Sequence, residues 1–199
     1  LKYVDQYGGK LAINSTSVNN LAVSDFRKKY LYKLSKVSNC ESIVTDKMPQ
    51  NFLFIPLICA AFPEAKIIHV QRNAAATCWS NFKHYFSKKG LGYCYNLKDL
   101  VTYYELYLDL MELWQSEYSN QIYNLNYEKL INKSEYETKK LLKYCELEWD
   151  ENCLNFYKNE KTVSTASVAQ VRNPIYKTSI KNWENYTKEL KSLKNMLEI

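Results

Sequence analysis

Two kinds of apolar pattern alternate along the first two thirds of the chain. AKIIHVQ at residues 65–71 is a β-branched run typical of a strand, and QIYNLNY at residues 121–127 alternates between apolar and polar positions. SIVTD at residues 42–46 predicts a further strand that is short and buried. Stretches with helical spacing separate these runs, so the pattern predicts an α/β fold in which helices flank a parallel sheet.

The helical segments are bounded by recognisable capping and breaking residues. Ser24 is a candidate N-cap for a helix that reaches Val37, and Asn73 is a natural N-cap for a helix that runs to residue 87 or so. NFLFIPLICAA at residues 51–61 predicts a buried helix, with Pro56 at a bend or in the first turns. Further helices are expected at residues 97–118, from Tyr127, near 134–146, at 151–158, and from Ser179 onward through Trp183, Tyr186, Leu190 and Leu193.

The helix expected at residues 97–118 carries apolar residues on two of its faces. Such a helix is expected to be largely buried, so its aromatic residues are interpreted as core. Trp183 is interpreted as core for the same reason, because it repeats at helical spacing with later apolar residues. The two faces consist of Leu100, Tyr104, Leu108 and Met111, and of Tyr103, Tyr107, Leu110 and Trp114.

Composition favours one compact domain that spans residues 1–199. The 199 residues are 46% hydrophobic, and no Pro-, Gly- or Ser-rich linker divides them. The formal charge of +6, from 27 basic and 21 acidic residues, suits an anionic ligand. No nucleic-acid partner is expected, because the aromatic residues lie on apolar stripes rather than among clustered cations.

The cysteines and the hydropathy bear on the compartment. The six cysteines form no CxxC pair and have no histidine at zinc spacing, so they are expected to be reduced thiols, and no metal site is predicted. No apolar run approaches the roughly 20 residues of a membrane helix, and no signal-peptide pattern follows Leu1. The sequence therefore predicts no membrane segment in this chain and a location in the cytoplasm.

The segment after the first clear strand holds the strongest candidate for a binding site. Ligands of an open parallel sheet bind beyond the carboxyl ends of its strands, where Arg72 is expected. The next helix starts there, Ala74–Ala76 would let a ligand approach, and Ser80 shares a helix face with residue 84. An arginine, a hydroxyl and a further cation from Lys83 or His84 suit a phosphate. The alternative is that Arg72 is a solvated strand-end arginine and Ser80 an ordinary helix serine.

Four sequence blocks in a fixed order extend this hypothesis. They are TDKMPQNF at 45–52, FPEAKIIHVQRNAAATCWS at 62–80, NYEKL at 126–130 and STASVAQVRNPIYKTSIKNWENY at 164–186. Together they resemble the C-terminal part of the sulfotransferases that use 3′-phosphoadenosine 5′-phosphosulfate (PAPS), and are closest to the bacterial tetratricopeptide-linked and tyrosylprotein branches. The resemblance covers about Ile43 to Tyr186, and it implies a sulfotransferase fold like that of the P-loop nucleoside triphosphatases.

The resemblance also implies roles for individual residues. Arg72 and Ser80 match the pair that grips the 3′-phosphate, and Lys47 matches the lysine near the 5′-phosphosulfate, the catalytic candidate. Tyr127 matches the tyrosine beside the adenosine; the alternative is a strand-end tyrosine that merely packs. Ser164, Thr165, Ser167 and Arg172 fall in the TAS…QVR block of the family, and Lys177 to Ser179 occupy the place where the family folds a basic loop over the nucleotide; for each of these residues a solvated polar loop is the alternative.

The chain also departs from the family pattern. The family's Gly-Thr-Thr-type phosphate loop has no counterpart, and the paired Gly8 and Gly9 lack its hydroxyl residues. The usual catalytic base has no secure counterpart either; His69 is expected to be structural, and neither it nor His84 is a convincing base. Either the chain is the C-terminal portion of a longer enzyme, which the missing N-terminal Met favours, or it is a member that has lost catalysis.

The resemblance implies transfer of a sulfuryl group from PAPS to a hydroxyl acceptor without a metal, leaving adenosine 3′,5′-bisphosphate (PAP). The acceptor could be a saccharide, a peptide tyrosine or a small alcohol. The alternative is a catalytically incomplete nucleotide-binding or interaction remnant of the same fold.

Overall fold

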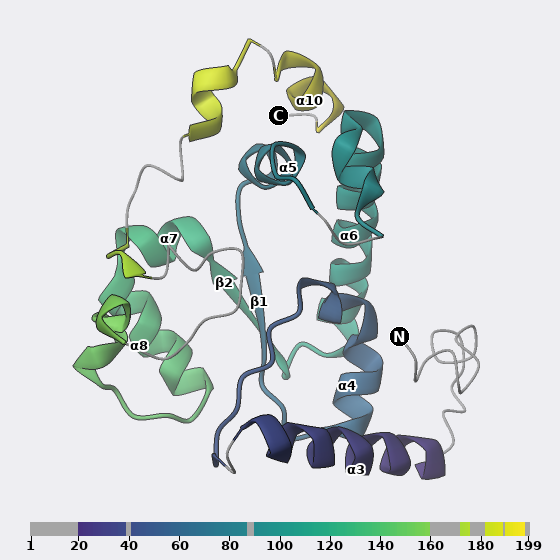
Figure 1. The fold of residues 1–199 in the computed structure, drawn as a ribbon, viewed down its shortest axis with the longest axis vertical. Coiled ribbons are helices and arrows are strands. Elements are labelled where there is room, and N and C mark those ends of the chain that lie inside the picture. The colour runs from purple at the N-terminus through teal and green to yellow at the C-terminus, as the bar shows by residue number, and fades with distance from the viewer. Residues whose placement is uncertain are drawn as a thin grey trace. The chain divides into compact units, whose positions relative to one another are not determined.

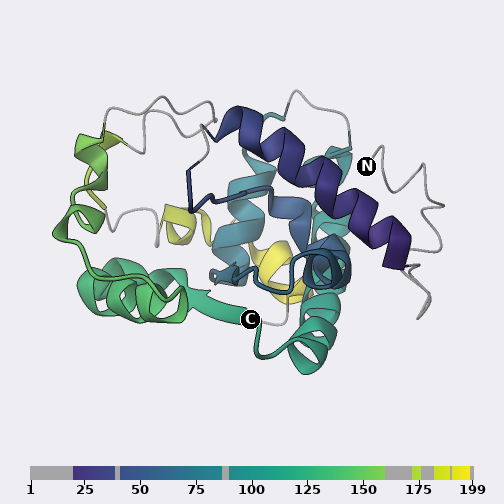
Figure 2. The same ribbon diagram turned by 90° about the horizontal axis from the view of Figure 1, so that it is seen from below.

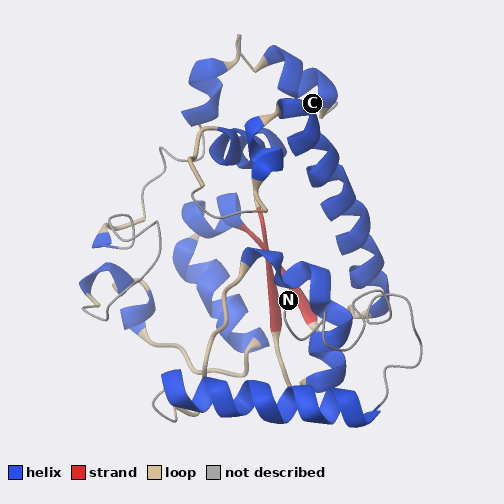
Figure 3. Ribbon diagram, turned by 45° about the vertical axis from the view of Figure 1, so that its right-hand side comes forward, coloured by secondary structure: helices blue, strands red, loops and turns tan. Residues whose placement is uncertain are grey.

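The computed structural model describes residues 20–38, 41–86, 90–159, 172–175, 182–188 and 190–197. These residues form two compact units. The first contains the described residues up to Ala65 together with Leu110–Gln121, and the second contains Lys66–Asp109 and the described residues from Ile122 onward. Helices predominate and a small parallel sheet is present, which is the α/β class that the sequence predicts (Figure 3).

In the first unit, a long α-helix packs against a shorter one that directly follows a 3-10 helix. Helix α3 (Asn20–Val37) is one unbroken helix (Figure 2), η1 covers Pro49–Phe54 and α4 covers Ile55–Ala61. The helix starts before Ser24, so the prediction that Ser24 caps it is wrong. The prediction for Pro56 is confirmed, because proline occupies the first turn of α4, where it costs no helical hydrogen bond.

Aromatic and polar contacts hold this first unit together. The Phe62 ring lies 5.1 Å from Tyr30 and 6.1 Å from Phe26, centroid to centroid, which joins the end of α4 to α3. The indole nitrogen of Trp114 donates to the Phe52 carbonyl oxygen over 2.9 Å. Residues 110–121 are thereby tied to the η1 segment of the same unit.

Residues 42–46 do not form the strand that their composition predicts. They adopt irregular structure, and Ile43 and Val44 are exposed by 60% and 39%. In the described part of the chain the sheet has two strands, and this segment is neither of them. A β-branched run becomes a strand only when its backbone pairs with a neighbour, and that pairing cannot be seen in the run itself.

In the second unit, the two strands expected at residues 65–71 and 121–127 pair in parallel. Strand β1 (Ile67–Gln71) and strand β2 (Ile122–Asn126) lie side by side (Figure 1), with Ile67 opposite Ile122 and Gln71 opposite Asn126. Each strand is followed directly by a helix, as the sequence predicts. The carboxyl ends of both strands, and the starts of both helices, therefore meet at one edge of the sheet.

Most helices of the second unit lie where the sequence predicts them, but several are shorter than predicted. Helix α5 ends at Phe82, about one turn before the expected end, and residues 151–158 form short 3-10 turns instead of one continuous helix. In the segment expected to be helical from Ser179 onward, the described residues include a 3-10 helix at Asn182–Tyr186 and an α-helix at Lys191–Met196. The elements are α5 (Ala74–Phe82), η2 (Gly92–Tyr95), α6 (Leu97–Glu117, whose last residues belong to the first unit), α7 (Tyr127–Asn132), α8 (Ser134–Tyr144), η3 (Glu151–Cys153), η4 (Phe156–Lys158), η6 (Asn182–Tyr186) and α10 (Lys191–Met196).

A buried cluster joins α5, α6 and the C-terminal helix of this unit. Trp183 packs against it, which confirms its interpretation as core. Helix α6 is less buried than its two apolar faces predict, since Leu108 is 46% exposed. The five described cysteines are free thiols. The cluster consists of Cys78, Leu100, Val101, Leu190 and Leu193.

Candidate functional site

The end of the parallel sheet brings together two residues that the sequence analysis proposes as ligands of one nucleotide. Because Gln71 and Asn126 are opposite one another in the register, the next residues, Arg72 and Tyr127, also become neighbours. The guanidinium carbon of Arg72 lies 5.1 Å from the centroid of the Tyr127 ring, a cation–π contact. Both side chains are partly buried. The arrangement presents a cation and an aromatic ring together beyond the carboxyl ends of the strands.

The two turns that follow the strands are built alike. The side-chain oxygen of Asn73 accepts a hydrogen bond from the Ala76 backbone over 2.9 Å, which confirms Asn73 as the N-cap of α5. Asn126 caps α7 in the same way and accepts from the Lys129 backbone over 2.8 Å. Each strand thus passes into its helix through an asparagine cap, which fixes the direction in which the helix starts.

A further residue at this edge, Glu128, was not identified from the sequence. Its carboxylate accepts a hydrogen bond from the backbone N–H of Asn73 over 2.9 Å. The Glu128 carboxylate therefore lies at the positive N-terminal end of α5, which is the position where the sequence predicts that an anion binds. The signal that could have found it is an acidic residue in the first turn of α7, directly after Tyr127.

Ser80 lies on α5 and is partly buried, and its contact with a phosphate stays a prediction. Of the two cations expected one turn further on, Lys83 still continues the helical turn, since its backbone N–H donates to the Trp79 carbonyl oxygen over 3.1 Å. Helix α5 ends at Phe82, so Lys83 is its C-cap and His84 follows the helix, and both are exposed. The His84 ring packs edge-on against Phe86, with centroids 4.7 Å apart. The helical alignment predicted for residues 76, 80 and 84 therefore includes only the first two.

The other predicted ligands lie elsewhere in the chain. Lys47 is exposed and belongs to the first unit, in the irregular segment that follows residues 42–46. Arg172 is exposed within the short described range 172–175. The roles of both remain predictions. The other predicted positions of the TAS…QVR block and of the basic loop lie outside the described residues: Ser164, Thr165, Ser167, Lys177 and Ser179.

His69 belongs to a polar network in the middle of the sheet, as expected of a structural histidine. Its Nδ1 lies 2.8 Å from the side-chain oxygen of Asn124, its partner in the register, and its Nε2 contacts the Tyr107 hydroxyl. The Tyr107 O–H donates to Nε2 when Nδ1 carries the proton and donates to Asn124. Burial lowers the pKa of His69 below its usual value, and burial raises the pKa of Tyr107 to about 12. The network is thus neutral near pH 7.

The described residues also bear on metal binding and on membrane insertion. No group of three or more His, Cys, Asp or Glu residues in the described ranges is placed to hold a metal ion. Within those same ranges, no helix has the length and apolar character required to cross a bilayer.

Comparison with known proteins assigns the chain to a family. The model of the Sulfotransferase family matches residues 9–151. An uncharacterized protein of Aquifex aeolicus (strain VF5) is 34% identical over 171 residues, which cover 85% of this chain and 22% of that protein. The chain belongs to the sulfotransferase family. It spans about a fifth of the length of this curated relative.

Proposed function

We propose that this chain forms part of a sulfotransferase that uses PAPS as sulfuryl donor and a hydroxyl group as acceptor. The observation that carries the proposal is the contact of Arg72 with Tyr127 at the ends of two adjacent parallel strands. In open α/β sheets this edge is where nucleotides bind. The family membership supports sulfuryl transfer in general, and the strand-end pair supports a nucleotide as the donor.

The residues at the sheet edge fit the proposed donor. A guanidinium binds a phosphate through two parallel N–H groups, so Arg72 would hold the 3′-phosphate, with the Ser80 hydroxyl as a further donor. Tyr127 offers a flat apolar face for the adenosine and, through its contact with Arg72, limits the directions that the guanidinium can take. PAPS, when bound, would supply an activated sulfuryl group that leaves the bridging phosphate oxygen as the acceptor oxygen forms its bond to sulfur.

The chemical step would require positive charge where the bridging oxygen becomes negative. Fixed cations at developing charge are a large source of rate enhancement in group transfer. We assign this role to Lys47, because it matches the lysine near the 5′-phosphosulfate in the sequence resemblance. The proton of the acceptor hydroxyl leaves to a general base. His69 is a poor candidate for that base, since both of its ring nitrogens already contact protein groups. Ser167 and Arg172 would contact the nucleotide, and the basic loop from Lys177 to Ser179 would lie over it.

We further propose that residues 1–199 form one sulfotransferase-like domain related to the P-loop nucleoside triphosphatases. A saccharide, a peptide tyrosine and a small alcohol are the acceptor classes to compare. Sulfate transfer from radiolabelled PAPS to one of these three, by the full chain, is the expected result.

The decisive measurement is the affinity for PAP by calorimetry. Arg72→Ala is expected to weaken PAP binding by about a hundredfold, because it removes a charge-assisted bidentate contact. Lys98→Ala, which removes an exposed cation from α6, is the matched control and should bind as wild type does. Equal affinity of Arg72→Ala and wild type would refute the phosphate site. PAP binding without transfer to any acceptor would support the catalytically incomplete alternative.

A further inference from the structure

Two consecutive residues of α7 hold Arg72 at two points. The Tyr127 ring lies under the guanidinium, and the Glu128 carboxylate accepts from the backbone N–H of Asn73. That N–H belongs to the peptide unit that joins Arg72 to Asn73. The side chain of Arg72 and the peptide bond that follows it are thus both held from the neighbouring strand end.

The hydrogen bond to Glu128 restricts the backbone at the point that aims Arg72. A peptide plane is flanked by one soft dihedral on each side, so holding the Arg72–Asn73 plane restricts the ψ angle of Arg72 and the φ angle of Asn73. The Asn73 cap holds the same turn from its other side, because its side-chain oxygen accepts from Ala76 over 2.9 Å. A turn held in this way keeps the Arg72 side chain in place before a ligand arrives, which lowers the entropic cost of binding.

The negative charge of Glu128 has a second, opposite effect on phosphate binding. The carboxylate lies beside the start of α5, where its negative charge is favourable for the helix but unfavourable for an incoming phosphate. A neutral side chain that still accepts the Asn73 hydrogen bond would keep the geometry and remove the repulsion. The two effects can therefore be separated by comparing glutamine with alanine at this position.

We propose that Glu128 is a positioning residue that sets the Arg72 turn for phosphate binding through the Asn73 N–H. This inference rests on the proposed function, since the phosphate is that of PAP. Glu128 does not contact the ligand in this account. It acts on affinity only through the backbone of Asn73 and the aim of Arg72.

The test measures PAP affinity by calorimetry, and melting temperature without ligand, in the full chain. Glu128→Ala is expected to weaken PAP binding by about tenfold, because the turn loses a charge-assisted hydrogen bond. Glu128→Gln should bind PAP as tightly as wild type, or up to severalfold more tightly. Glu128→Asp keeps the charge but is one methylene shorter, so it should resemble alanine, and it decides the question if Glu128→Ala does not fold. Glu105→Ala, on the exposed side of α6, is the control.

The outcomes separate this inference from the function on which it rests. If wild type binds PAP and Glu128→Ala binds it equally well, Glu128 is only structural and the inference fails while the proposed function stands. Equal impairment of Glu128→Gln and Glu128→Ala would also overturn it, because a positioning role requires rescue by the retained acceptor. If wild type does not bind PAP, the proposed function and this inference fail together.

Discussion

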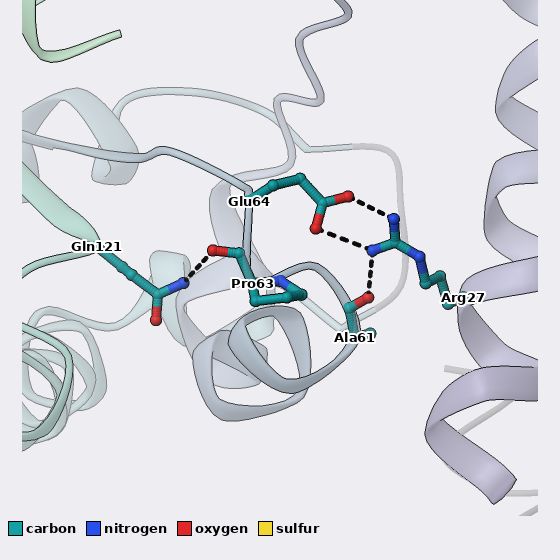
Figure 4. A network of polar contacts seen from close by, with 5 residues as sticks. All are labelled: Arg27, Ala61, Pro63, Glu64 and Gln121. Atoms are coloured by element: carbon teal, nitrogen blue, oxygen red, sulfur yellow. Dashed lines mark hydrogen bonds and ion pairs between the residues drawn. The ribbon is translucent and has the colours of Figure 1, made fainter. Parts of the chain in front are cut away.

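Two arginines, one in each unit, contact aromatic rings at nearly the same distance but in different surroundings. Arg27 lies 5.2 Å from the Phe62 ring centroid and Arg72 lies 5.1 Å from that of Tyr127. The Arg27 guanidinium donates to both carboxylate oxygens of Glu64, over 2.6 and 3.0 Å, and to the Ala61 carbonyl oxygen over 2.7 Å (Figure 4). It thereby binds the last turn of α4 to α3.

The difference shows that an arginine on an aromatic ring does not by itself indicate a ligand site. Arg27 neutralises a glutamate and caps a helix end, next to the hydrogen bond from Gln121 to Pro63 (Figure 4). The carboxylate nearest in sequence to Tyr127, that of Glu128, accepts from a backbone N–H instead. What distinguishes Arg72 is its place beyond the ends of parallel strands, where a fold of this class binds ligands.

Replacing each arginine by lysine tests this distinction most strongly. Arg72→Lys is expected to weaken PAP binding by about tenfold, because an ammonium group can neither fork onto a phosphate nor stack flat on Tyr127. Its melting temperature should change little. Arg27→Lys should lower the melting temperature and leave PAP affinity unchanged, since it loses the bidentate contact with Glu64. Calorimetry measures the PAP affinity of both variants, and thermal melts measure their stability. A loss of PAP affinity in Arg27→Lys alone would show that Arg27, and not Arg72, binds the phosphate.

The aromatic partners sharpen the same contrast. Tyr127→Leu should weaken PAP binding by about fivefold, because both the flat face and the cation–π contact are lost. Phe62→Leu should instead lower the free energy of unfolding by about 1 kcal/mol, through lost contacts with Phe26 and Tyr30. Urea denaturation measures the second effect. Tyr127→Phe is the control for the ring, and affinity as low as that of Tyr127→Leu would show that the hydroxyl matters more than the face.

The stability of the second unit should also depend on pH through a partly buried histidine, His69. Burial lowers the pKa of His69 in the folded protein, so the unfolded chain binds more protons below the ordinary value of 6.5. The contribution to stability is therefore complete above that pH and is lost as the pH falls through the lowered value. Urea denaturation measures the free energy of unfolding, and between pH 7 and pH 5 this free energy should change less with pH for His69→Gln than for wild type. His84→Gln replaces the other, exposed histidine and should retain the wild-type pH dependence.

The smallest effect is expected from the ion pair of the first unit. The hydrogen bond from Arg27 lowers the pKa of Glu64, so this pair stabilises the fold above the ordinary glutamate value of 4.5 and loses its effect as the pH falls through the lowered value. Both side chains are well exposed, at 37% and 59%, and solvent screens the pair. Glu64→Gln should therefore be slightly less stable than wild type at pH 7 and equal to it at pH 3. A difference that persists at pH 3 would contradict the assignment.

Local signals in the sequence account for much of the fold. The run at residues 65–71 became β1, the alternation at residues 121–127 became β2, and Asn73 caps the helix that follows. These elements depend on side-chain periodicity and on hydrogen bonds within a few residues, which can be read from neighbouring positions. SIVTD fails for the opposite reason, because a strand needs a partner that lies elsewhere in the chain.

The sequence by itself determined the family, the parallel α/β class and the two strand-end candidates, Arg72 and Tyr127. Only the tertiary structure decided that these two side chains meet, because their contact depends on the register of β1 against β2. It alone also revealed the bond from Asn73 to Glu128, between residues 55 positions apart. The periodicity within a segment predicts which side chains share a face, but the residues that they contact depend on the register in which distant strands pair.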